Sequence, residues 1–223
     1  MKHRFLVHDP AARSLTIFFA GWGSSPERFR DLHLAGGQDL LLLWDFDGAV
    51  GPLPDLARYE TVDVVGWSLG VRIAADWAMK SHVPVRRFTA VAGTLSPIDR
   101  RLGIPPAVFD RTTDRFGEAT LEGFLLNMTG SVEAARTLRG TERSLESLGH
   151  ELRLLRDTYR DAPFEGDLRT RVEEVFAFIP EADRIVPAAA QRRAWDSLGV
   201  TTVGTCEPHW CPEALQRAVD GKF

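Results

Sequence analysis

This chain of 223 residues has few cysteines, no long apolar run and only a small excess of one charge. Its two cysteines cannot build a disulfide framework, so a reducing cytoplasm is the expected location. No apolar run approaches the length of about 20 residues that crosses a bilayer, and residues 1–13 lack the apolar segment of a signal peptide. The net charge of −4 argues against nucleic acid as a partner. We therefore expect a cytoplasmic globular protein with no membrane and no nucleic-acid partner.

Short apolar runs that end in turn residues alternate with helix-like stretches along much of the chain. Strands are expected at residues 14–20, 40–44, 62–65, 88–92, 175–179 and 201–205. Helices are expected at residues 26–33, 68–82, 188–198 and 213–220. Because the central runs are apolar on both alternations, their strands should be covered on both faces. This pattern predicts an α/β fold with a mainly parallel sheet flanked by helices.

Residues 95–170 interrupt this alternation. A loop is expected over residues 97–110, and helices are expected over 115–128, 131–139 and 141–160. We therefore predict one α/β domain over residues 1–223. Its core would consist of residues 1–94 and 171–223, and residues 95–170 would form a helical lid or cap.

The stretch Gly66-Trp67-Ser68-Leu69-Gly70 fits the pattern G-x-S-x-G between an expected strand and an expected helix. At such a turn the serine takes a strained backbone conformation and exposes its Oγ at the edge of the sheet. The start of the following helix supplies free N–H groups and a positive dipole end. Ser68 is therefore the candidate nucleophile, and the Leu69 N–H is a candidate donor to an oxyanion. The alternative is a tight turn with an incidental serine.

The second half of an oxyanion hole should follow an earlier strand. Gly21-Trp22-Gly23 stands at that place, and its glycines let the backbone turn beneath a reacting carbonyl. The Trp22 N–H is the candidate donor. A glycine-rich turn that only precedes the helix at Pro26 is the alternative. A phosphate-binding loop is not expected, because neither G-x-x-x-x-G-K-[ST] nor G-x-G-x-x-G occurs.

A serine nucleophile requires a base, and in this fold the order along the chain is serine, acid, histidine. Of the histidines that follow Ser68, His150 and His209 are the candidates. His150 lies in a charged helical stretch, where a surface position is expected. His209 follows the last expected strand, where this fold places its base, and is the predicted base.

The acid should follow the preceding strand, where Glu181 and Asp183 occur. Asp183 lies deeper in the turn and is the predicted acid. A helix cap for residues 188–198 is the alternative role for Asp183. Asp45 or Asp47, after the strand at residues 40–44, are the alternative acids.

Three potential metal ligands lie close together near the end of the chain. Cys206, His209 and Cys211 fall within six residues. No second cluster offers a fourth ligand at the spacing of a zinc site, so neither a metal nor a cofactor is expected.

Five stretches resemble the BioG-type pimeloyl-[acyl-carrier protein] methyl ester esterases, a family within the α/β-hydrolases. They are GWG at 21–23, GWSLGV at 66–71, AGTLSPIDRRLGIPPAVF at 92–109, EADRIVP at 181–187 and PHW at 208–210. Residues 92–109 are the most specific stretch, because generic hydrolases lack it. The resemblance covers nearly the whole chain. It departs from the family at Leu69, where members often carry Met, and a backbone donor tolerates that exchange.

The resemblance implies hydrolysis of the methyl ester of pimeloyl-[acyl-carrier protein] to pimeloyl-[acyl-carrier protein] and methanol, in biotin synthesis. It implies Ser68 as nucleophile, Asp183 as acid and His209 as base, without a cofactor. Trp22 and Leu69 would supply the oxyanion N–H groups. The alternatives are another small serine acyl hydrolase, such as a thioesterase or a general carboxylesterase, and a non-catalytic binding protein with this fold.

The implied partner is an acyl carrier protein that carries a pimeloyl methyl ester. Because this carrier is acidic, a basic docking patch is expected. The candidates are Arg100, Arg101, Arg136, Arg139 and Arg143. The last three share one helix face if a helix continues through Gly140. A solvated helix face of mixed charge is the alternative.

Overall fold

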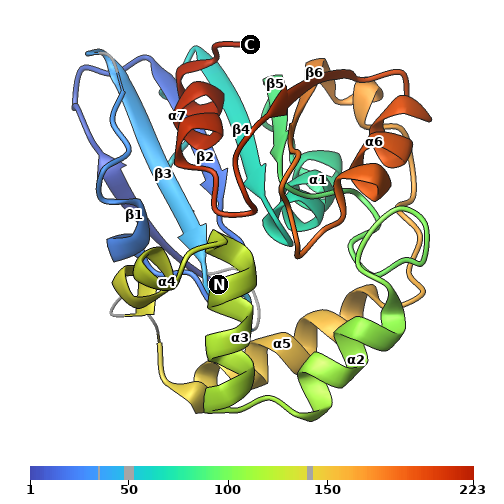
Figure 1. Cartoon of the computed structure of the whole chain (residues 1–223). Coiled ribbons are helices and arrows are strands. Elements are labelled where there is room, and N and C mark those ends of the chain that lie inside the picture. Colours follow the sequence, from blue (N-terminus) through green and yellow to red (C-terminus); the bar gives the residue numbers. More distant parts are fainter. Residues whose placement is uncertain (35, 48–52, 140–142) are drawn as a thin grey trace.

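A mainly parallel sheet forms the centre of the computed structural model, which describes residues 1–34, 36–47, 53–139 and 143–223 (Figure 1). The seven strands follow the order β1-β3-β2-β4-β5-β6-β7. Their bounds are β1 Lys2–Val7, β2 Ser14–Phe19, β3 Gln38–Trp44, β4 Thr61–Trp67, β5 Val85–Val91, β6 Val172–Pro180 and β7 Thr201–Thr205. Only β1 pairs antiparallel, with β3, among these neighbours. The predicted fold class is confirmed.

The central strands are apolar because helices cover both faces of the sheet. Ile17 on β2 stands beside Leu41 on β3 and Val64 on β4, and all three are fully buried. Helix α1 (Gly70–Lys80) packs on β4 and β2, and α6 (Ala188–Asp196) packs on β6 and β7. Helix α7 (Pro212–Asp220) packs on β4 and β5 and lies in front of the sheet in Figure 1, with α1 behind it.

Three local predictions are corrected by the structure. The edge strand β1 was not expected. The helix expected at residues 26–33 is only the short 3₁₀ helix η1 (Pro26–Phe29). The loop expected at residues 97–110 already contains the start of α2 (Pro106–Asp114), because Pro106 at the first helical turn lacks only an N–H that would be unpaired there.

A helical insertion separates β5 from β6. It contains α2, α3 (Glu118–Thr129), α4 (Val132–Arg139) and α5 (Leu145–Tyr159), followed by the 3₁₀ helix η2 (Leu168–Thr170). Residues 141 and 142 of the expected third helix lie outside the described residues. Helices α2–α5 lie beyond the carboxyl ends of the parallel strands, below the arrowheads in Figure 1. No helix in the described ranges is both long and apolar enough to cross a membrane.

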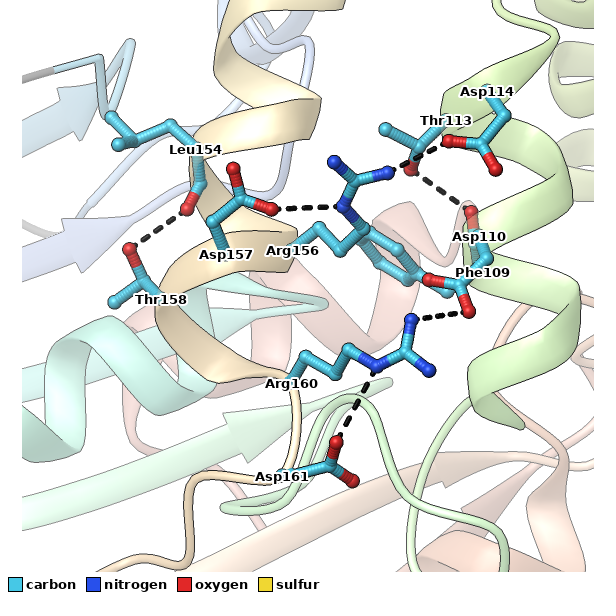
Figure 2. A network of polar contacts seen from close by, with 10 residues as sticks. All are labelled: Phe109, Asp110, Thr113, Asp114, Leu154, Arg156, Asp157, Thr158, Arg160 and Asp161. Atoms are coloured by element: carbon cyan, nitrogen blue, oxygen red, sulfur yellow. Dashed lines mark hydrogen bonds and ion pairs between the residues drawn. The ribbon is translucent and has the colours of Figure 1, made fainter.

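Ion pairs join the first and last long helices of the insertion. Arg156 on α5 binds Asp114 on α2 at 2.8 Å, and Arg160 binds Asp110 at 2.5 Å (Figure 2). Each arginine also pairs with the aspartate that follows it on its own segment. These exposed pairs fix the orientation of α2 against α5 more than they stabilise the fold.

Both ends of the insertion are tied to the helix that follows Ser68. Arg72 on α1 is buried, and its guanidinium donates to the carbonyl oxygens of Leu95 (2.8 Å), Ala162 (3.0 Å) and Pro163 (3.1 Å). A buried guanidinium needs such acceptors, because an unpaired charge in the interior is costly. One side chain therefore positions the insertion relative to the turn that carries Ser68.

Candidate active site

Ser68 occupies the tight turn between β4 and α1. Its φ of 57° lies in the left-handed region, which costs a non-glycine residue about 1–3 kcal/mol. The Ser68 N–H donates to the carbonyl of Val91 on β5 (2.9 Å), which holds this conformation. At Gly70, a Cβ would collide with the carbonyl oxygens of Phe19 and Ala20. Glycine is required there because β2 and the start of α1 approach each other so closely.

His209 and Asp183 meet Ser68 at this turn. The Ser68 Oγ lies 2.9 Å from His209 Nε2, and His209 Nδ1 lies 2.8 Å from Asp183 Oδ2. Both partner side chains are fully buried. Since a carboxylate only accepts, Nδ1 carries the proton and Nε2 presents its lone pair to the Ser68 hydroxyl. The three residues come from the ends of β4, β6 and β7, and the structure brings them together in the order of a nucleophile, a base and an orienting acid.

The second carboxylate oxygen of Asp183 is held by the backbone. Its Oδ1 accepts from the N–H groups of Ile185 (2.8 Å) and Val186 (2.9 Å). Gln191 Nε2 donates to Oδ2 at 2.9 Å, beside the bond from His209. A carboxylate can accept from all four donors, and its charge can stabilise a protonated imidazole.

The alternative acids have other partners. Glu181 pairs with Arg192, and Asp45 binds Lys2 at 2.7 Å. Asp47 lies 3.8 Å from the N-terminal amine of Met1. Asp183 therefore holds the place beside His209 that the sequence left open between several carboxylates.

The loop that carries His209 is anchored on both sides. Trp67 Nε1 donates to the His209 carbonyl at 3.1 Å, and the Trp210 N–H donates to the carbonyl of Met128 on α3 at 2.8 Å.

The two cysteines beside His209 differ in exposure. Cys211 is buried, and burial raises the pKa of its thiol well above the usual range, whereas Cys206 is exposed. Among the described residues no group of three or more His, Cys, Asp and Glu side chains could hold a metal.

Two backbone N–H groups beside Ser68 remain free to bind an oxyanion. Within the described part of the chain, neither the Trp22 N–H nor the Leu69 N–H donates a hydrogen bond. The loop after β2 passes directly beside Ser68, since a Cβ at Gly21 would lie 2.9 Å from the Ser68 Cβ. Free N–H groups from a strand loop and from the residue after the nucleophile form the usual oxyanion hole of this turn.

A cavity of about 280 Å³ opens between Ser68 and the insertion. Its wall is mainly apolar and includes Trp22, Leu69, Ile104, Val108, Phe109, Phe124, Leu152 and Ile185. Polar side chains add Thr112, Thr120, Asn127 and Arg184 to the lining. Val108, Asn127 and Arg184 are also exposed to solvent, so the cavity opens beside these residues. This shape and polarity suit an aliphatic chain with a polar continuation.

The five candidate docking arginines do not form one patch. Arg100, Arg101 and Arg136 are exposed, whereas Arg139 pairs with Glu118 and Glu122. Helix α4 ends at Arg139, and continuation through Gly140 lies outside the described residues.

The surface role predicted for Arg143 is wrong. Only 11% of its side chain is exposed, and it pairs with Asp45 and Glu151 inside the molecule. The reason is that α5 carries the buried Glu151, whose charge draws the arginine inward. His150, one residue earlier, is exposed, as expected of a surface position.

Sequence reasoning missed basic residues that lie closer to the cavity. Arg184 lines it directly, next to Asp183. Arg111 on α2 and Arg115 at its C-terminal cap are exposed, and each follows a lining residue, Val108 or Thr112, by three positions. The described residues offer no ion-pair partner to Arg111, Arg115 or Arg184. The position of Arg184, directly after the candidate acid, is the one signal that could have identified it.

Residues 1–209 match the family model for the pimeloyl-ACP methyl esterase BioG. The chain belongs to this family. A Bacteroides fragilis relative, malonyl-[acyl-carrier protein] O-methyltransferase, is 33% identical over 188 residues, which are 83% of this chain but 37% of the relative. This chain therefore spans little more than a third of that protein. The family that the sequence motifs predicted is confirmed.

Solved structures show the same fold. The crystal structure of BioG from Haemophilus influenzae matches with a TM-score of 0.84 and 26% identity, covering 96% of both chains. An esterase from Exiguobacterium antarcticum matches with a TM-score of 0.70 and 12% identity, covering 97% of this chain and 92% of the esterase. The second likeness shows the α/β-hydrolase fold alone. The chain therefore combines membership of the BioG family with the α/β-hydrolase fold.

Proposed function

We propose that this protein is a serine esterase that removes the methyl ester from pimeloyl-[acyl-carrier protein], releasing methanol, in biotin synthesis. The observation that carries the proposal is the Ser68 Oγ, 2.9 Å from His209 Nε2 at the bottom of an apolar cavity, in a chain of the BioG family. Helices α2–α5 would act as the lid of a single domain.

Acylation begins when His209 Nε2 takes the hydroxyl proton of Ser68. The Oγ attacks the ester carbonyl, and the N–H groups of Trp22 and Leu69 receive the developing oxyanion. Removing one such donor typically costs about 10²–10³ in kcat. Asp183 stabilises the imidazolium while it exists. The imidazolium then gives its proton to the departing methoxide, so that methanol leaves and the acyl group stays on Ser68.

Deacylation repeats these steps with water. His209 takes a proton from the water molecule, and the resulting hydroxide attacks the acyl-Ser68 carbonyl. Collapse of the second tetrahedral intermediate breaks the Oγ–carbon bond, and the imidazolium returns the proton to Ser68. The free carboxylic acid leaves on its carrier, and the protein returns to its starting state.

The cavity could hold an extended acyl chain with its ester at Ser68. Methylene groups would lie against the apolar wall formed by Phe109, Phe124 and Leu152. The polar arm that links the acyl group to the carrier would leave past Thr112 and Asn127. An ester at the end of a long aliphatic chain therefore suits this arrangement.

We extend the docking proposal to the basic residues beside the cavity. Arg111, Arg115 and Arg184 are exposed, and an acidic carrier with a phosphate on its arm would complement them. Arg100, Arg101 and Arg136 are exposed too and remain candidates farther along the surface.

The Bacteroides relative adds chemical support. Methyl transfer to the oxygen of a malonyl group, which its name describes, produces a methyl ester on a carrier-bound acyl chain. A methyl ester of that kind is the group that our proposed reaction removes.

The proposal is tested by incubating pimeloyl-carrier-protein methyl ester with the wild-type protein and with Ser68→Ala, followed by mass spectrometry of the carrier. Loss of one CH₂ with the wild type alone is the expected result. Rapid cleavage of a short p-nitrophenyl ester without any change in the carrier would instead favour a general esterase. Release of the acyl chain from the carrier would favour a thioesterase, and no reaction with either substrate would favour a binding protein.

A further inference from the structure

A buried carboxylate on the insertion reaches two loops of the core. Glu151 lies on α5 and is fully buried. Its Oε2 accepts from the Gly23 N–H at 3.1 Å, and its Oε1 accepts from the Phe46 N–H at 2.7 Å. Arg143 pairs with the same carboxylate and also with Asp45. Glu151 thus links the insertion to the loops that follow β2 and β3.

The loop after β2 is the one that supplies the Trp22 N–H. The Gly23 N–H donates to Glu151, whereas the Trp22 N–H has no acceptor among the described residues. The Trp22 indole Nε1 donates to the carbonyl of Leu148 at 2.9 Å, one turn before Glu151 on α5. Both residues of the loop are therefore fastened to the same helix of the insertion.

The groups around Glu151 are all hydrogen-bond donors. Burial raises the pKa of Glu151 overall, although Arg143 and the N–H groups of Phe46 and Gly23 counteract part of that rise. A protonated carboxyl group would turn an O–H donor toward one of these donors. The matched set of two N–H groups and one guanidinium fits a carboxylate and no neutral side chain of the same size.

We propose that Glu151 is a positioning residue that holds the Trp22–Gly23 loop in the arrangement that binds the oxyanion. The contact that packs α5 against the core then also positions the Trp22 N–H in the oxyanion hole. The inference rests on the proposed function to the extent that Ser68 attacks an ester. It requires nothing of the carrier protein.

The test is Glu151→Gln, assayed on a short p-nitrophenyl ester. Glutamine keeps the size of the side chain but offers one acceptor oxygen, so its NH₂ group must face either Gly23 or Phe46. Loss of a well-placed oxyanion donor lowers kcat by about 10²–10³, and a displaced donor should lower it by about 10–100. We expect KM to change by less than about threefold, because the oxyanion forms only in the transition state.

The matched control is Glu146→Gln on the same helix. Glu146 is exposed and does not contact the Trp22–Gly23 loop, so the Glu146→Gln variant should keep the wild-type kcat. Glu151→Asp keeps the charge but is one methylene shorter, and its kcat should lie between those of the wild type and Glu151→Gln. Equal kcat for Glu151→Gln and the wild type would overturn the inference.

A measurement on the wild type covers the case in which the variants do not fold. The amide proton of Gly23, followed by NMR, should exchange slowly with solvent because Glu151 accepts it. Fast exchange in the folded protein would overturn the inference as well. The proposed function fails separately: a wild type that cleaves the p-nitrophenyl ester but not the carrier ester leaves the role of Glu151 intact.

Discussion

Replacing Asp183 by Asn should reverse the direction of the hydrogen bonds at His209. In Asp183→Asn, the amide oxygen would take the place of Oδ1, since the backbone N–H groups of Ile185 and Val186 both point at it. The NH₂ group would then face His209 Nδ1, which lies 2.8 Å from the carboxylate in the wild type. This group can only donate, so Nδ1 must give up its proton and Nε2 must carry one. An Nε2–H cannot remove the Ser68 proton.

The size of this effect follows from the tautomer. A triad with the wrong tautomer and intact geometry loses about 10⁴ in kcat, or about 5 kcal/mol of transition-state stabilisation. KM should change little, because the cavity wall is not altered. The thermal midpoint should fall, because the new NH₂ group faces the Gln191 Nε2 donor and a buried donor without its acceptor costs about 1–3 kcal/mol.

The assay is p-nitrophenyl ester hydrolysis by Asp183→Asn beside Asp47→Asn. Asp47 was an alternative acid, but its side chain is 41% exposed and its partner is the N-terminal amine of Met1. We expect activity within about twofold of the wild type for Asp47→Asn, as for most surface substitutions. The reasoning would be refuted if Asp183→Asn kept more than a tenth of the wild-type kcat, or if Asp47→Asn lost as much as Asp183→Asn.

Three further predictions concern the scaffold. Gly70→Ala should destabilise the protein by about 1–3 kcal/mol, measured by urea unfolding, because its Cβ would collide with Phe19 and Ala20. Burial raises the pKa of Asp39, but bonds from Tyr59, the Asp9 N–H and His8 outweigh it and lower that pKa overall. A carboxylate whose pKa is lowered by folding stabilises the folded protein at pH values above the pKa of the unfolded chain. Asp39→Asn should therefore lower the free energy of unfolding by about 3 kcal/mol at pH 7, and this loss should shrink as the pH falls below about 4. A thiol reagent should modify exposed Cys206 and spare buried Cys211 in the folded protein, and equal modification would contradict the burial.

The parts of the fold that could be predicted depend on local patterns. The turn at Ser68 is recognisable because its two glycines flank the serine at a fixed spacing between a strand pattern and a helix pattern. His209 follows from its place after the last strand, since the carboxyl ends of parallel strands meet at one edge of the sheet. The family motifs then indicated the family, which local pattern alone cannot.

The parts that could not be predicted depend on distant partners. Strand β1 is half exposed and carries charged residues among apolar ones, so it lacks the apolar run that marks the central strands. Arg143 resembled a surface arginine because its partners lie on other elements: Asp45 follows β3, and Glu151 lies on α5. The bond between Glu151 and Gly23 spans 128 residues of sequence, and no periodicity in either segment announces it.

Trapping of the nucleophile tests the central claim most directly. The wild-type protein would be treated with a serine-directed alkyl phosphonate, digested, and examined by mass spectrometry for the peptide that contains Ser68. The account predicts one phosphonate per chain, on Ser68, with no label on Ser68→Ala and much slower labelling of Asp183→Asn. A folded wild type that stays unlabelled, or a label on any other residue, would contradict the assignment of Ser68 as the nucleophile.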